Sequence, residues 1–136
     1  MISAVIPTHH GAARLARNLG SVVASLAASG EPWEIVVVDD GGGDPYELPA
    51  GARLLRSDRN RGYGPAVNAG VEAALGEYLL VLNDDVRLEA ACVSRLRGRL
   101  EERSLFAVVP AIRSLLAACG DEGGKVGVWR AGMIDL

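Results

Sequence analysis

The feature that most constrains the fold is a series of short aliphatic runs, each followed by a turn or by polar residues. Four such runs stand out: Ser3–Ile6, Glu34–Val38, Ala52–Leu55 and Tyr78–Leu82. Unbroken runs of this length are typical of strands that are buried on both faces of a parallel sheet. Hydrophobic residues make up 49% of the chain and aromatic residues only 4%, so the core is expected to be mostly aliphatic.

Apolar residues at helical spacing separate these runs and continue after the last of them. In the first expected helix the buried stripe is Leu15, Leu19, Val22 and Leu26, and Gly30 and Pro32 end the helix. The second is expected to start at Gly64-Pro65 and to stop at Gly76, with Val67, Val71 and Leu75 buried. The third is expected over Leu88–Arg103, with Val93, Leu96 and Leu100 buried and Arg95, Arg99 and Arg103 in solvent. The alternation predicts one α/β domain over residues 1–136, with further strands at Phe106–Val109 and Lys125–Trp129.

The overall charge argues against two classes of partner. A formal net charge of −3 and few aromatic residues leave no general basic footprint for nucleic acid or for an anionic membrane. Cys92 and Cys119 lack metal-ligand spacing and are expected to be reduced thiols, without a structural zinc. The chain starts without a basic leader and has no apolar run near the roughly 20 residues of a membrane span, so a cytoplasmic location is expected.

Polar residues follow three of the predicted strands. They are Pro7-Thr8-His9-His10, Asp39-Asp40-Gly41 and Asn83-Asp84-Asp85. Ligands of open parallel sheets bind outside the carboxyl ends of the strands, so all three groups are expected on one edge. Two carboxylates about 4 Å apart repel by ~1 kcal/mol in water and by roughly 4 kcal/mol at an effective dielectric of 20. A cation or a donor-rich ligand would offset this repulsion.

Asn83, Asp84 and Asp85 form the first candidate site. If strand geometry continues through them, Asn83 and Asp85 point one way and Asp84 the other. Their hard oxygen atoms suit Mg²⁺ or Mn²⁺, which bind through one or two carboxylates and complete their shell with water and phosphates. The alternative interpretation is a turn that caps the next helix.

Asp39 and Asp40 form the second candidate site. A carboxylate there can accept a hydrogen bond from the imide of uracil or thymine, or from the N1 and N2 donors of guanine. An Asp-Gly step after a strand is also ordinary turn chemistry. His9 and His10 lack the spacing of a metal motif, so a ligand contact or a surface position is expected for them.

Two other α/β folds place acids at strand ends. A dinucleotide-binding Rossmann unit has G-x-G-x-x-G after its first strand, where this chain has PTHHGAAR. A phosphoacceptor receiver domain carries its acid pair after the first strand, whereas here the pair follows the second. Neither pattern fits.

Four blocks in order, VIPTHHGAARLARNLGSV, EIVVVDDGGGD, RNRGYGPAVNAGVEAALG and EYLLVLNDDV, resemble the family 2 glycosyltransferases of the GT-A fold, and most of all their rhamnosyltransferase-like branch. The match runs from about Ser3 to Val86. The resemblance implies the nucleotide-binding half of that fold, a Rossmann-like, mainly parallel sheet flanked by helices that binds a nucleotide-diphosphate sugar.

The resemblance also implies roles for single residues. Pro7, Thr8 and His9 would line the nucleotide pocket beside Asp40, which reads the base with support from Asp39. Asn83, Asp84 and Asp85 match the D-x-D element: Asp85 would bind Mg²⁺ or Mn²⁺, and Asn83 and Asp84 would contact ribose or a metal-bound water. Arg59, Arg61 and Asn68 fall in the segment that flanks the sugar and diphosphate. Asn83 replaces a common acid, and His10 replaces the common Asn of the first motif.

The implied function is inverting transfer of a sugar from a UDP-, dTDP- or GDP-linked donor to a hydroxyl of a saccharide or lipid-linked acceptor. Family members run well past 200 residues, so the chain looks truncated in the acceptor half, and the general base is not identified; Asp135 does not match its position. The alternative is a nucleotide-sugar binding module without catalysis. A homodimer partner would cover the apolar end of the chain, and a peripheral membrane location is the second option beside the cytoplasm.

Overall fold

The computed structural model describes residues 1–102, 104–112, 128–130 and 133–135. Its contacts divide the chain into two compact units, Met1–Ser94 and Arg95–Leu136. In the second unit the described residues include a short antiparallel pair, β5 (Val128–Arg130) and β6 (Met133–Asp135). The first unit contains the sheet and all the polar strand ends. A single domain over residues 1–136 stays a prediction.

Four parallel strands build the first unit. They are β1 (Ile2–Thr8), β2 (Trp33–Asp39), β3 (Ala52–Arg56) and β4 (Tyr78–Val81), in the order β3-β2-β1-β4. Residues in both central strands, β1 and β2, are almost entirely buried, because a helix covers each face of the sheet. The prediction of a mainly parallel α/β sheet is therefore confirmed.

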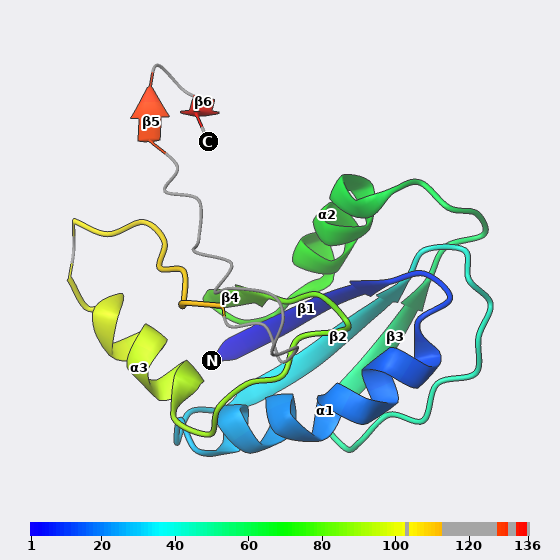
Figure 1. The fold of residues 1–136 in the computed structure, drawn as a ribbon, viewed down its shortest axis with the longest axis horizontal. Coiled ribbons are helices and arrows are strands. Elements are labelled where there is room, and N and C mark those ends of the chain that lie inside the picture. The colour runs from blue at the N-terminus through cyan, green and yellow to red at the C-terminus, as the bar shows by residue number, and fades with distance from the viewer. Residues whose placement is uncertain (103, 113–127, 131–132, 136) are drawn as a thin grey trace, which may run out of the picture. The chain divides into compact units, whose positions relative to one another are not determined.

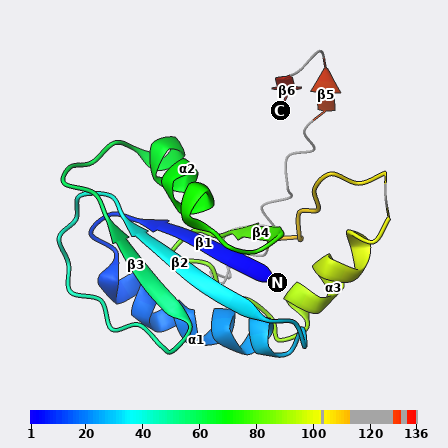
Figure 2. The same cartoon turned by 180° about the vertical axis from the view of Figure 1, so that it is seen from behind.

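The helices α1 (Ala12–Ala27) and α2 (Tyr63–Ala73) lie on opposite faces of this sheet (Figures 1 and 2). The face toward α1 is formed by alternate strand residues, with Ile6 and Ile35 buried among the predicted stripe Leu15, Leu19, Val22 and Leu26. The other face packs Val5 and Val38 against Ala66 of α2. Small residues let α2 approach closely: a Cβ on Gly70 would lie 2.4 Å from Cγ1 of Val5.

The end of α2 differs from the prediction. The helix stops at Ala73, and Leu75, expected in the buried stripe, is 76% exposed. The backbone N–H groups of Leu75 and Gly76 leave the helical path to bind the Glu34 carboxylate and the Ser3 hydroxyl, at 2.6 and 2.7 Å. Gly76 is needed for close approach, since a Cβ would lie 2.7 Å from the Ser3 nitrogen.

Glu34 is the centre of a buried polar cluster at this end of the sheet. It accepts hydrogen bonds from the Ser3 hydroxyl at 2.7 Å, from Arg53 Nε at 3.1 Å and from the Leu75 N–H. Burial alone would raise the pKa of Glu34, but the hydrogen bonds from Leu75, Ser3 and Arg53 together outweigh burial and lower it.

Replacing Glu34 with glutamine is expected to lower the free energy of unfolding at pH 7 by roughly 1–3 kcal/mol, because hydrogen bonds to a charged partner are lost. A lowered folded-state pKa stabilises the protein above the ordinary value of 4.5, and this contribution is lost as the pH falls through the folded pKa. Urea unfolding of wild type and of the glutamine variant, from pH 7 to below pH 4.5, measures the difference between their free energies of unfolding. This difference should become smaller as the pH falls. A constant difference would contradict the assignment.

The segment after β4 only partly matches the predicted third helix. Helix α3 covers Cys92–Arg99, a shorter span than Leu88–Arg103. Its start is set by α1, because the Ser25 hydroxyl accepts the buried Val93 N–H at 3.1 Å. Cys92 forms no disulfide within the described part of the chain, and Cys119 lies outside it. Among the helices of the described ranges, none combines the length and hydropathy of a membrane span.

The predicted strand at Phe106–Val109 is wrong. These residues have no strand pairing, and Phe106 and Val109 are 101% and 76% exposed. The segment buries too little apolar surface to offset the entropy of an ordered strand, and Pro110 cannot donate to a ladder. The predicted strand at Lys125–Trp129 overlaps β5, and residues 125–127 lie outside the described part of the chain.

Candidate nucleotide-binding site

The polar strand ends meet at one edge of the sheet, as predicted. The parallel register places Thr8 of β1 beside Asp39 of β2, and the Leu82 N–H after β4 binds the Val5 carbonyl. A cleft of about 730 Å³ opens there, lined by Pro7, Thr8, His9, Arg14, Asp40, Asn60, Gly62, Tyr63, Ala66, Asn83, Asp84 and Asp85. The cleft lining includes seven residues to which the resemblance gave roles: Pro7, Thr8, His9, Asp40, Asn83, Asp84 and Asp85. It does not include Asp39, nor Arg59, Arg61 and Asn68 of the predicted flanking segment.

The side chains after β4 alternate as predicted. Asn83 and Asp85 are exposed to the cleft, whereas Asp84 is 9% exposed. Within the described residues, the Asp85 carboxylate has no hydrogen bond or ion pair. An amide oxygen and a free carboxylate therefore share one side of the strand end.

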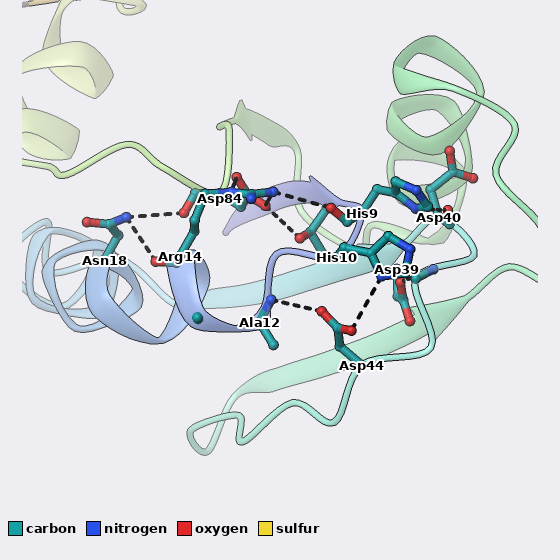
Figure 3. Close-up of polar contacts among 12 residues, drawn as sticks. His9, His10, Ala12, Arg14, Asn18, Asp39, Asp40, Asp44 and Asp84 are labelled. Carbon is teal, nitrogen blue, oxygen red and sulfur yellow. Dashed lines mark hydrogen bonds and ion pairs between the residues drawn. The ribbon is translucent and has the colours of Figure 1, made fainter.

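Asp84 is held by residues that follow β1. The Thr8 hydroxyl donates to its Oδ2 at 2.7 Å, and Arg14 donates to both oxygens, from Nε at 3.1 Å and from Nη2 at 3.0 Å. Figure 3 shows Arg14 and Asn18, both from α1, reaching this residue; Asn18 binds its backbone carbonyl at 3.2 Å. The hydrogen bond to Asp84 raises the pKa of Arg14 above its ordinary value.

Gly11 makes this contact sterically feasible. A Cβ at this position would lie 2.0 Å from Oδ2 of Asp84 and 2.2 Å from Oγ1 of Thr8. Any larger residue would displace the hydrogen bond between them. The glycine before α1 thus brings the end of β1 and the segment after β4 into direct contact.

The two acids at the end of β2, Asp39 and Asp40, have different environments. Asp39 is fully buried, accepts the N–H groups of Gly42 and Gly43 at 2.8 and 3.0 Å, and forms an ion pair with Arg56 at 3.3 Å. It stabilises the turn and does not face the cleft. The turn interpretation therefore describes Asp39 well.

Asp40 lines the cleft and holds its opposite wall. Its carboxylate accepts the N–H of Arg61 at 3.0 Å and that of Gly62 at 2.7 Å. A carboxylate has about four lone-pair positions, so capacity remains for a ligand donor. The carbonyl of Asp40 accepts a hydrogen bond from Nδ1 of His9 at 2.8 Å, which leaves Nε2 of that ring without the proton while the imidazole is neutral.

His10 is separate from the cleft. It has a φ of 49°, and its ring stands 3.6 Å from the Asp44 carboxylate through Nδ1 while its side chain stays 64% exposed. Of the two alternatives expected for the histidines, a ligand contact or a surface position, His10 has the surface position.

Sequence reasoning missed Arg14, Asn60, Gly62, Tyr63 and Ala66. Arg14 left a detectable signal, because a cation in the first turn of a helix is unfavourable with respect to the helix dipole and calls for an anionic partner. The other four belong to or follow the segment after β3, whose path depends on its backbone contacts with Asp40.

The donor set is compatible with a divalent cation that is shared with a ligand. The described residues contain no group of three or more His, Cys, Asp or Glu side chains placed to hold a metal. Asp85 and Asn83 offer one carboxylate and one amide oxygen. Mg²⁺ commonly binds through one or two carboxylates and takes its remaining ligands from phosphates and water, so these residues fit such an ion.

A parallel sheet with helices on both faces and a cleft at the carboxyl ends of its strands is a Rossmann-like α/β architecture. The chain belongs to glycosyl transferase family 2, whose model matches residues 3–116. The predicted family is thus confirmed, and the rhamnosyltransferase-like branch stays a prediction.

Two curated relatives illustrate the match. The chain is 32% identical over 120 residues to the succinoglycan biosynthesis protein ExoO of Rhizobium meliloti, covering 84% of this chain and 33% of that protein. It is 31% identical over 104 residues to an undecaprenyl-phosphate 4-deoxy-4-formamido-L-arabinose transferase of Pectobacterium carotovorum, covering 70% and 32%. The chain spans about a third of the length of these relatives.

Solved structures share the fold. TarS of S. aureus in complex with UDP-GlcNAc matches with a TM-score of 0.62 and 23% identity, over 76% of this chain and 32% of that one. A mannosyltransferase from Pyrobaculum calidifontis in complex with GDP-Man and Mn²⁺ matches with a TM-score of 0.55 and 21% identity, over 66% and 29%.

Proposed function

We propose that this chain is the donor-binding part of a glycosyltransferase that binds a nucleotide-diphosphate sugar together with Mg²⁺ or Mn²⁺. The observation that carries the proposal is the convergence of Asp40, from β2, with Asn83 and Asp85, after β4, on one cleft. Family membership supports sugar transfer as the reaction class.

The residues would divide the donor between them. Pro7, Thr8 and His9 form the wall beside Asp40, whose free lone pairs would accept the imide N–H of uracil or thymine or the donors of guanine. Asp39 supports this wall from the buried side.

Asp85 and Asn83 would hold the cation at the diphosphate end, with Asp84 between them nearer the ribose. When bound, the cation stabilises the charge that develops on the leaving diphosphate. The proposed reaction is inverting: an acceptor hydroxyl, deprotonated by a base, displaces the nucleoside diphosphate in line at the anomeric carbon. The described residues supply no candidate for that base, which must come from the acceptor side.

The proposed acceptor is a saccharide or a lipid-linked hydroxyl compound, since one relative is named for transfer involving undecaprenyl phosphate. The proposed location is the cytoplasm, including its membrane surface, and a second copy of the chain is a proposed partner. A non-catalytic nucleotide-sugar binding module is the second candidate, because the chain spans only a third of its relatives.

Calorimetry of UDP, dTDP and GDP, each with Mn²⁺ and with EDTA, tests the binding proposal. At least one nucleotide should bind, and Mn²⁺ should strengthen the binding. If none of the three binds under either condition, both nucleotide functions fail. A donor-hydrolysis and transfer assay with the nucleotide sugar that corresponds to the best ligand then separates an enzyme from a binding module.

A further inference from the structure

Asp84 stands in the middle of the proposed metal-binding segment, yet its side chain is already engaged. Arg14 donates to both carboxylate oxygens, and the Thr8 hydroxyl donates to one of them. The Asp84 side chain is only 10% exposed, whereas the Arg14 side chain is 44% exposed. Asp84 therefore lines the cleft as an engaged and largely buried acid, whereas Asn83 and Asp85 are exposed to it.

We propose that Arg14 is a positioning residue that withholds Asp84 from the cation, so that Asp85 is the single carboxylate of the metal site. This inference rests on the proposed function. Arg14, in the first turn of α1, would thus control the position of Asp84, which follows β4 and lies 70 residues further along the chain.

Charge supports the assignment. Asp84 and Asp85 are adjacent in the chain, and two unpaired carboxylates repel each other more strongly where the local dielectric is low. The bidentate pair with Arg14 neutralises the first of them. A cation then meets one net negative charge after β4, and its remaining ligands come from the diphosphate and from water.

The surrounding contacts fix the arginine in this position. Nη2 of Arg14 also donates to the His9 carbonyl at 3.3 Å, and Asn18, one turn later on α1, binds the carbonyls of both Arg14 and Asp84. The Asp84 carboxylate also lies directly against Gly11, where a Cβ would come within 2.0 Å of its Oδ2. Loss of the guanidinium would leave this carboxylate, which lines the cleft, with the Thr8 hydroxyl as its remaining side-chain partner among the described residues.

The test compares wild type with Arg14→Met, Asp84→Asn and the double variant by calorimetry of UDP, with Mn²⁺ and with EDTA. The measured quantity is the ratio of the two dissociation constants, which gives the strengthening by Mn²⁺. In Arg14→Met the freed Asp84 becomes a second carboxylate, so the ratio should rise by about tenfold, within the range of coupled neighbours. The double variant has no free acid at position 84 and should return close to the wild-type ratio.

Arg17→Met is the matched control. Arg17 lies on the same helix and, among the described residues, donates only to the Ala13 carbonyl of its own turn, so its replacement should leave the ratio unchanged. Arg14→Lys, which keeps the charge but loses the bidentate geometry, should give an intermediate increase and serves in place of Arg14→Met if that variant does not fold.

An unchanged or smaller ratio in Arg14→Met, or a double variant that stays as altered as the single one, would overturn the inference. The second result would mean that Arg14 acts on the nucleotide directly. If the wild-type chain binds no UDP, dTDP or GDP with or without Mn²⁺, the proposed function fails first and the inference fails with it. If wild type binds and Arg14→Met matches it, only the inference fails.

Discussion

Replacing Asp85 with alanine is expected to abolish the strengthening of nucleotide binding by Mn²⁺. Asp85 is the free carboxylate after β4, and no other acid there replaces it while Asp84 stays paired with Arg14. Loss of a residue that only orients a metal ligand costs about 10- to 100-fold in metal affinity, so loss of the only carboxylate ligand should cost at least as much. Calorimetry of UDP should then give the same dissociation constant with Mn²⁺ and with EDTA.

Asp58→Ala is the control for this variant. Asp58 is an exposed acid, 80% accessible, outside the cleft lining, and its removal changes the net charge by the same amount. It should leave the effect of Mn²⁺ intact. Persistent strengthening by Mn²⁺ in Asp85→Ala would show that the cation is held elsewhere.

Replacing Gly41 with alanine is expected to destabilise the protein and to weaken nucleotide binding together. Gly41 has a φ of 74°, and a Cβ there would lie 2.4 Å from the backbone carbonyl carbon of Arg59 and the nitrogen of Asn60. The left-handed conformation costs about 1–2 kcal/mol for a residue with a Cβ, and the overpacking adds roughly 1–3 kcal/mol. Urea unfolding and UDP calorimetry measure the two effects.

Gly43→Ala separates the two causes. Gly43 has a similar φ of 71°, but no atom lies within 4 Å of a Cβ built there. This variant should lose only the conformational part, about 1–2 kcal/mol, and keep its affinity for UDP. Equal losses of stability and equal UDP affinities in the two variants would contradict this prediction. They would mean that the backbone at residues 59–60 shifts to accommodate the methyl group without changing the cleft.

The sheet could be predicted because the aliphatic runs are buried on both faces. A short β-branched run such as Val36–Val38, ended by acids and glycines, is typical of a central strand in a covered parallel sheet, and these residues are indeed inaccessible. The failure at Phe106–Val109 has the opposite cause. A run of similar composition becomes a strand only where an edge and a covering face are available, and composition does not report either.

The site was predictable to the extent that it lies at strand ends. The parallel arrangement determines that Thr8, Asp40 and Asp85 share an edge, and the period of two along a strand separates Asp84 from its neighbours. The partners of these acids were not predictable in the same way. Arg14 and Gly62 reach the site through a helix start and a loop, whose positions depend on contacts between segments distant in the chain.

The central place of β1 in the sheet has a consequence for how the protein acquires its cleft. Its neighbour on one side, β4, lies about 75 positions later in the chain. The second row of backbone hydrogen bonds on β1 therefore forms only after β4 has been brought back to it across that separation in sequence. A nascent chain ending at Ala74 would leave this edge of β1 open and would leave Thr8 and Arg14 without Asp84. A complete cleft therefore requires that these two distant segments have already paired.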